Sequence, residues 1–226
     1  MNEPSFSLES AQMTAAKRDS QPERKSNGKY EAILRAAIKV FAGSGFFNSK
    51  VADVAREAGV ADGTVYLYFK NKDDILVSIF NYYMDEALAA GKHRLAEVED
   101  PIEKLRRIVH AHLERLGRDR NLAVVFQVEL RSSTKFMEQF SATKVTEYLE
   151  LIREVIEEGQ RQGVFRAGLN TKVVAKVLFG ALDEMATNWV LSRKRYSLIS
   201  TAEPVLDVFL NGIQGSRVAG SHGEAK

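Results

Sequence analysis

The sequence predicts an all-α protein with a small N-terminal domain and a larger C-terminal helical bundle. Apolar residues recur at three- and four-residue steps along most of the chain, which is the spacing of one buried stripe on a helix. No segment sustains the alternation of apolar and polar residues that a half-buried strand requires. The 226 residues and the 45% hydrophobic composition suffice for the core of one large domain or of two small ones.

The chain begins with a polar segment and then becomes helical. Residues 1–28 are rich in serine, glutamine, asparagine, lysine and glutamate, so we expect them to form a disordered arm. From Lys29 onward, the apolar spacing predicts a first helix that ends at the glycines of residues 43–45. The expected buried stripe of this helix comprises Ile33, Ala36, Ala37, Val40 and Phe41.

Three more helices are predicted before the second domain. Residues 50–58 form one of them, and Gly59 supplies the left-handed conformation of the turn that follows. A short helix then covers residues 62–69. Asn71 is the expected N-cap of a long helix that reaches about residue 90, because its side chain can accept a hydrogen bond from the first turn.

The rest of the chain predicts a helical bundle and a loose, glycine- and serine-rich end. The further helices are expected at about 101–117, 121–133, 134–140, 143–162, 171–192 and 200–213. We therefore divide the chain into a disordered arm (1–28), a small helical domain (29–75), a larger helical bundle (76–214) and a flexible tail (215–226).

The short helix over residues 62–69 indicates what the small N-terminal domain does. A helix, a glycine-centred turn and a short second helix form a helix-turn-helix motif, whose second helix enters the major groove of DNA. Val65 and Phe69 stand four residues apart and are expected to pack inward, while Gly63 permits close backbone approach. Hydroxyl, methyl and aromatic groups on the opposite face can contact base edges and phosphates of double-stranded DNA. The residues expected on that face are Thr64, Tyr66, Leu67 and Tyr68.

Two lysines support the same interpretation. Lys50 and Lys72 are both placed in the first turn of a predicted helix, where the positive end of the helix dipole repels a cation. A bound phosphate at each helix start removes that penalty, since helix N-termini bind anions well. We therefore expect both lysines to lie close to the DNA backbone.

The segment Ser49–Leu76, SKVADVAREAGVADGTVYLYFKNKDDIL, resembles the DNA-binding segment of the TetR family of bacterial repressors. The resemblance implies that Lys72 contacts phosphate, and that the later helices bind a small molecule and form a homodimer on an inverted-repeat operator. The residues that the resemblance assigns to groove reading are Gly63, Thr64, Tyr66, Leu67 and Tyr68.

Within that family, the second domain is similar to the fatty-acid-degradation (FadR-type) regulators. The similarity is carried by NLAVVFQVELRSS (Asn121–Ser133) and FGALDEMATNWVL (Phe179–Leu191). It implies that a long-chain acyl-CoA enters the helical bundle and releases the protein from DNA, which controls fatty acid degradation genes. No cofactor is implied.

An acyl-CoA site needs an apolar tunnel for the chain and cationic groups for the phosphates of CoA. The candidates for the tunnel are Val125, Phe126, Phe140, Ile152, Phe179 and Leu182. The candidates for the phosphate contacts are Arg106, Arg107, Arg118, Arg120 and Arg131. Residue by residue, ordinary core packing and surface charge explain the same sequence pattern.

The dimer interface is expected on the last two long helices, residues 171–192 and 200–213. No later helix covers the second of these, so a partner subunit is a plausible cover for its apolar side. We expect Phe209 to be central to that interface.

Several classes of protein are disfavoured by the sequence. There is no cysteine, which excludes disulfides and thiolate metal sites and favours a cytoplasmic location. His110 and His112 lack the four-residue spacing of a helical metal pair, and no P-loop, dinucleotide or nucleophile-elbow motif is found, so neither a metal site nor a catalytic residue is assigned. No apolar run approaches the length of a membrane span. Two alternatives stay open: a TetR-type repressor that senses a drug or another hydrophobic molecule, and an architectural DNA-binding protein without a ligand.

Overall fold

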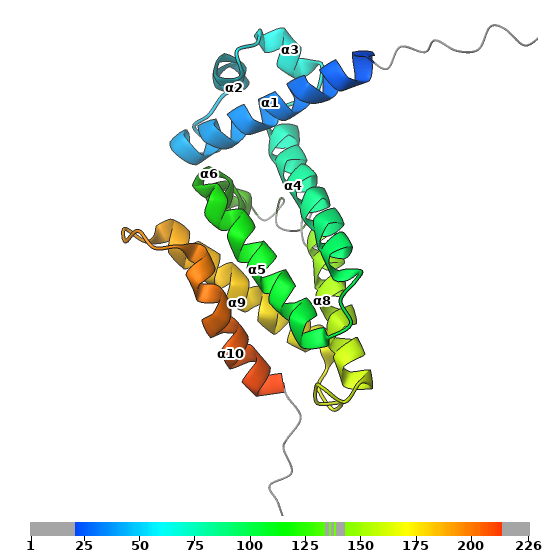
Figure 1. Ribbon diagram of the computed structural model, residues 1–226. Coiled ribbons are helices and arrows are strands. Elements are labelled where there is room, and N and C mark those ends of the chain that lie inside the picture. The colour runs from blue at the N-terminus through cyan, green and yellow to red at the C-terminus, as the bar shows by residue number, and fades with distance from the viewer. Residues whose placement is uncertain (1–20, 134–135, 137, 139–142, 214–226) are drawn as a thin grey trace, which may run out of the picture.

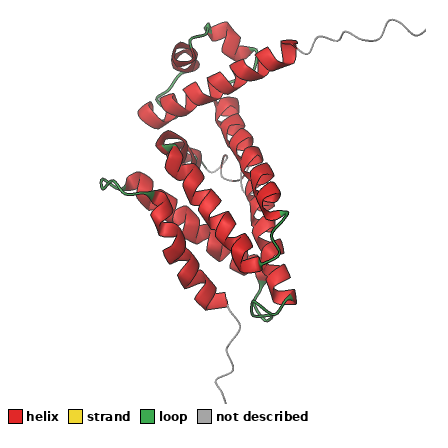
Figure 2. Ribbon diagram, in the orientation of Figure 1, coloured by secondary structure: helices red, strands yellow, loops and turns green. Residues whose placement is uncertain are grey.

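The computed structural model describes residues 21–133, 136, 138 and 143–213, which form helices joined by loops and turns. These residues contain no strand, as predicted (Figure 2). None of the described helices is both long enough and apolar enough to cross a membrane. The expectations for residues 1–20, for Phe140 and for the tail beyond residue 213 fall outside the described residues.

The first three helices build the N-terminal domain. They are α1 (Gln21–Ser44), α2 (Val51–Ala58) and α3 (Asp62–Tyr66). The helix α1 begins at Gln21 and not at Lys29, so residues 21–28 are helical where an arm was expected. Pro22 suits this position, because proline is favoured in the first turn of a helix.

The helix α4 (Lys72–Leu95) starts in the N-terminal domain and continues into the second domain (Figure 1). Its N-cap is Asn71 as predicted, since the Asn71 side chain accepts a hydrogen bond from the backbone N–H of Asp74 at 2.9 Å. The second domain then adds α5 (Pro101–Arg118), α6 (Arg120–Val124), α8 (Lys144–Arg161), α9 (Thr171–Leu191) and α10 (Ala202–Ile213).

The segment after α6 is not the single regular helix that was expected over residues 121–133. It changes to a π-helical turn at Val125–Glu129 and then to a 3-10 turn at Leu130–Ser132. Such π-turns widen the helix locally and are frequent at functional sites. The helix α6 and the π-turn both pack against α1, so this irregular segment forms a contact between the two domains.

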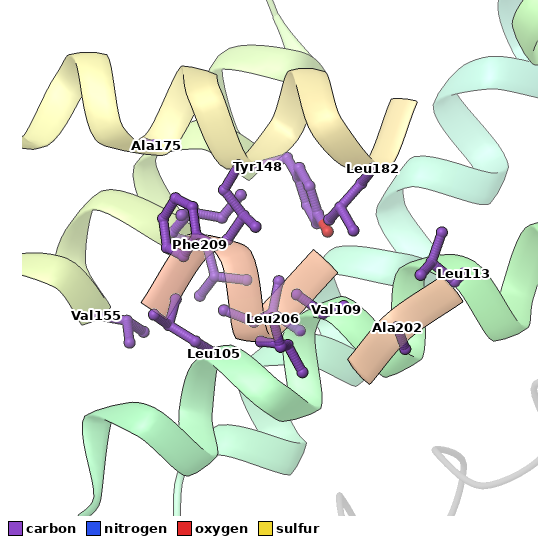
Figure 3. Close-up of a cluster of buried hydrophobic side chains, with 14 of the residues drawn as sticks. Leu105, Val109, Leu113, Tyr148, Val155, Ala175, Leu182, Ala202, Leu206 and Phe209 are labelled. Atoms are coloured by element: carbon purple, nitrogen blue, oxygen red, sulfur yellow. The ribbon is translucent and has the colours of Figure 1, made fainter. Parts of the chain in front are cut away.

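The apolar core has two parts. The first lies wholly in the second domain, where Leu105, Val109 and Leu206 are buried between α5, α9 and α10 (Figure 3). The second is the core of the N-terminal domain, and it includes side chains from the second domain. The contributing residues are Leu122, Val125, Leu130 and Phe136.

The position of Phe209 corrects one prediction. Its side chain is only 7% exposed and packs in the core of the second domain beside Leu206 (Figure 3). The neighbouring Val208 is 76% exposed. On α10, Phe209 therefore points inward and covers α5 and α9. The exposed apolar residue of this helix is Val208, where Phe209 was expected.

Candidate DNA-binding surface and ligand cavity

The outer face of α3 is a short stripe of exposed aromatic and apolar groups. Val65 and Phe69 are 0% and 2% exposed, as the four-residue spacing predicted. Tyr66 and Leu67 project outward and are 57% and 81% exposed. Tyr68 is half-buried, with its ring 6.3 Å from that of Tyr30, so it offers less free surface than its neighbours.

Three more residues complete this surface. Gly63 and Lys50 are exposed at or before the first turns of α3 and α2, and Thr64 is half-buried. Phe47, in the loop between α1 and α2, was not singled out in the sequence although it is 66% exposed. Its ring packs edge-on against Phe46 at 5.4 Å, so the loop presents an exposed aromatic group.

Lys72 is the first residue of α4, as predicted, and its ammonium group is bound within the N-terminal domain. Its ammonium group donates hydrogen bonds to the carbonyl oxygens of Phe46, Phe47 and Ser49 at 2.6, 3.2 and 2.9 Å. It also lies 4.5 Å from the centre of the Phe46 ring, a cation–π distance. All three N–H groups of the ammonium are thus used inside the domain. Lys72 closes the loop between α1 and α2, and the phosphate contact stays a prediction.

A cavity of about 570 Å³ lies in the second domain. Its wall is formed by one side of α4, the facing side of α5, the π-turn and parts of α8 and α9. Most of the lining is apolar, and small residues leave the space between α4 and α5. Those small residues are Ala87, Ala90, Gly91 and Ala111.

The predicted tunnel residues divide into two groups. Phe126 and Phe179 line the cavity. Val125, Ile152 and Leu182 are 0% exposed and do not border it, because they fill the cores between the helices. The structure therefore does not place these three residues on the cavity wall.

The arginines predicted to contact phosphate also fall into two groups, those that border the cavity and those that do not. Arg107, Arg118 and Arg131 border the cavity. Arg106 does not, since its guanidinium binds Glu203 on α10.

Arg120 is likewise outside the cavity. It donates hydrogen bonds to the carbonyl oxygens of Trp189, Val190 and Ser192 and so caps the end of α9. Its guanidinium also lies 4.8 Å from the Trp189 ring. The structure therefore does not bring Arg106 and Arg120 to the cavity.

Two arginines at the rim were missed in the sequence, Arg94 and Arg115. Arg115 binds Glu86 at 2.7 Å. The guanidinium of Arg94 has no acceptor among the described residues, and the Arg94 side chain is exposed. Arg115 could have been predicted from its spacing. It follows Arg107 and Ala111 at four-residue steps along α5, which places the three residues on one face of the helix.

A polar pair interrupts the apolar wall. His112 Nδ1 and the Tyr148 hydroxyl lie 3.0 Å apart, and His112 Nε2 is enclosed without a hydrogen-bond partner among the described residues. Burial lowers the pKa of His112 to about 4 and raises the pKa of Tyr148. Both groups are therefore neutral at pH 7, which suits a wall that faces an apolar ligand.

The low pKa of His112 predicts a pH-dependent stability. Between about pH 6.5 and pH 4 the unfolded chain protonates this histidine and the folded protein does not, so the free energy of unfolding falls as the pH falls. Replacing His112 with glutamine removes this pH-dependent contribution to the free energy of unfolding. From pH 7 to pH 5 we expect the parent to lose about 2 kcal/mol more than His112→Gln in urea unfolding. His93→Gln provides the control, because His93 is an exposed histidine of α4. Parallel pH profiles of parent and His112→Gln contradict the assignment.

Two family models together cover most of this chain. The model of the bacterial regulatory proteins, tetR family, matches residues 33–79, which hold most of α1, the helices α2 and α3 and the start of α4. The model of the C-terminal region of YsiA-like proteins matches residues 80–212, which include the cavity. The chain belongs to the TetR family. Members of this family are transcriptional regulators and not enzymes, so the expectation that the chain is no enzyme is confirmed.

Individual TetR-family relatives narrow the comparison. The chain is 37% identical to the fatty acid metabolism regulator protein of Bacillus subtilis, over 82% of this chain and 95% of the relative. Two solved structures each match 82% of this chain and all of their own. The fatty acid degradation regulator FadR of Bacillus halodurans has a TM-score of 0.77 at 38% identity. FadR of Bacillus subtilis in complex with stearoyl-CoA has a TM-score of 0.78 at 35% identity. The predicted resemblance to the FadR-type regulators is thereby confirmed.

Proposed function

We propose that this protein is a repressor of fatty acid degradation genes that binds an inverted-repeat operator as a homodimer and is released by a long-chain acyl-CoA. The observation that carries the proposal is the long apolar cavity with arginines at its rim. Support comes from the similarity to a FadR protein that binds stearoyl-CoA. A purely architectural DNA-binding protein has no need of such a cavity.

The cavity offers both parts of an acyl-CoA site. Along α4 its lining runs from Phe80 to Leu95, a helical rise of about 22 Å. Each methylene buried against this wall contributes about 0.8 kcal/mol. Arg94 and Arg107 lie together at one end, where Arg107 donates a hydrogen bond to the Arg94 carbonyl oxygen at 3.0 Å. The free guanidinium of Arg94 suits a CoA phosphate, since arginine binds phosphate oxygens through two parallel hydrogen bonds.

A CoA phosphate bound at Arg94 defines the orientation of the ligand in the cavity. With the phosphates at Arg94, the acyl chain extends along α4 toward Phe80 and Phe126. That end of the cavity is the one beside α6 and the π-turn, which contact the DNA-binding domain. A short chain stops before it reaches this end, so release from DNA should require a long chain.

A second copy of the chain fits the outer side of α9 and α10. Both helices carry exposed apolar residues, and they pack side by side at the edge of the second domain (Figure 1). Such a set of large apolar side chains is typical of an interface between subunits. The exposed residues are Val173, Val177, Leu191 and Val208.

The test is a titration of the protein–operator complex with acyl-CoAs of increasing chain length, followed by fluorescence anisotropy. We expect release by long chains and none by short acyl-CoAs or free CoA. Ala111→Phe narrows the cavity and should abolish release, while operator binding without ligand stays unchanged. Arg94→Ala should weaken acyl-CoA binding about tenfold, because a charged hydrogen-bonded contact of about 1.5 kcal/mol is lost.

Arg106→Ala is the matched control, since Arg106 is an arginine of α5 that does not border the cavity. Its response to acyl-CoA should equal that of the parent. Equal indifference of the operator complex to all chain lengths overturns the choice of ligand, and a drug or another hydrophobic molecule then becomes the first alternative.

A further inference from the structure

One hydrogen bond joins the two domains at a defined point. The backbone N–H of Phe46, in the loop between α1 and α2, donates to Glu129 Oε2 at 2.7 Å. The two residues are separated by 83 positions in the sequence. Phe46 is only 2% exposed and Glu129 is half-buried, so the bond is partly shielded from water, and the charge of the acceptor strengthens it.

The Phe46 peptide region is held from both sides. Glu129 accepts from its N–H, and Lys72 at the start of α4 donates to its carbonyl oxygen at 2.6 Å. The Phe46 ring also meets the ring of Phe136 edge-on at 5.5 Å, and Phe136 belongs to the second domain. The loop that leads into the helix-turn-helix is thus positioned by groups from α4 and from the second domain.

Glu129 lies beside the wall of the cavity. It ends the π-turn, in which Phe126 and Gln127 border the cavity, and it precedes Leu130, which borders the cavity as well. Leu130 is also part of the core of the DNA-binding domain, as is Leu122 of α6. A ligand that displaces these side chains must therefore move the backbone that carries the Glu129 carboxylate.

We propose that Glu129 is the positioning residue through which occupation of the cavity changes the placement of the DNA-binding domain. The inference rests on the proposed function and assigns its regulation to one hydrogen bond. In the ligand-free protein the bond between Glu129 and Phe46 holds the arrangement that binds the operator. A chain long enough to press on Phe126 and Leu130 shifts the π-turn and breaks the bond.

Two consequences follow from linkage. A ligand changes operator affinity only if it binds the two arrangements differently, and the operator must then change ligand affinity by the same factor. Without the bond, the protein is already partly in the released arrangement. The operator should then bind less tightly, the ligand at least as tightly, and the factor that couples the two sites should shrink.

The experiment compares the parent with Glu129→Ala, Glu129→Gln and Glu129→Asp. The measured quantities are the operator Kd with and without stearoyl-CoA, and the stearoyl-CoA Kd without DNA. We expect at least about a tenfold increase of the parent operator Kd upon ligand binding, within the usual range of coupling between sites. For Glu129→Ala the ligand-free operator Kd should rise several-fold and the additional effect of ligand should fall to about twofold or less.

The conservative variants separate positioning from general stability. The amide oxygen of Glu129→Gln still reaches the Phe46 N–H and should restore coupling, whereas Glu129→Asp keeps the charge but withdraws its oxygens by one methylene and should behave like alanine. If Glu129→Ala fails to fold by circular dichroism, Glu129→Asp replaces it in the comparison. Glu154→Ala is the control, because Glu154 is an exposed carboxylate of α8.

Unchanged operator affinity and unchanged coupling in a folded Glu129→Ala or Glu129→Asp overturn the inference. Hydrogen exchange of the Phe46 amide provides a readout that needs no ligand: exchange should be slow in the parent and in Glu129→Gln and fast in the other two variants. If the parent ignores every acyl-CoA, the proposed function fails. The role of Glu129 is then judged by operator affinity and amide exchange alone, and equal values in all variants overturn it.

Discussion

Replacing Lys72 with methionine is expected to abolish operator binding and to lower the free energy of unfolding by about 2–4 kcal/mol. Methionine retains the apolar stem but leaves the carbonyl oxygens of Phe46, Phe47 and Ser49 without their donor. The loop that sets the position of α2 then loses its closure. Urea unfolding measures the loss of stability, and anisotropy with labelled operator measures the loss of binding.

Tyr66→Ala is the matched comparison for the loss of DNA binding. Tyr66 is 57% exposed on the outer face of α3, so its removal should weaken binding to the specific operator without lowering stability. A Lys72→Met variant of parental stability, with binding weakened equally for all DNA sequences and a salt slope reduced by about 1, contradicts the structural role. That outcome favours the phosphate contact.

Introducing a charge at Val208 is expected to convert the proposed dimer to a monomer and to reduce operator affinity by more than a hundredfold. Val208 is 76% exposed on α10, and a carboxylate buried against a second subunit costs several kcal/mol. Each monomer of Val208→Glu then contacts only one half of an inverted repeat. Sedimentation velocity and operator titration measure the two effects.

Phe209→Ala provides the contrast on the neighbouring residue. Because Phe209 packs in the core of the second domain, its truncation should cost about 3–5 kcal/mol of stability and not act primarily on association. A Val208→Glu protein that remains dimeric at micromolar concentration shows that the subunits meet elsewhere.

The face of α3 could be predicted from the sequence because it depends on local periodicity. A four-residue step separates Val65 from Phe69, and the geometry of one helix then fixes that Tyr66 and Leu67 lie on the other side. The same reasoning found Asn71, since a helix cap involves only the next three residues.

The environment of Lys72 could not be predicted in this way. Its partners are backbone carbonyl oxygens of a loop 23 to 26 residues earlier, and a backbone group carries no mark in the sequence. The wall of the cavity posed the same difficulty. Phe126 borders the cavity while Val125 and Ile152 fill the core, and all three are apolar residues on helices. Only the packing of helices that are distant in the sequence distinguishes them.

The shared core of the N-terminal domain limits how this protein can be recombined with its relatives. Leu122, Val125 and Leu130 of the second domain complete that core, so a fragment that ends within α4 exposes the apolar surface which they cover. A hybrid regulator made by exchanging DNA-binding domains at α4 would pair the DNA-binding domain of one protein with the α6 and π-turn segment of another. The side chains on the two sides of this contact would then come from different proteins. To give such a hybrid a working response, the α6 and π-turn segment has to be transferred together with the domain whose operator is wanted.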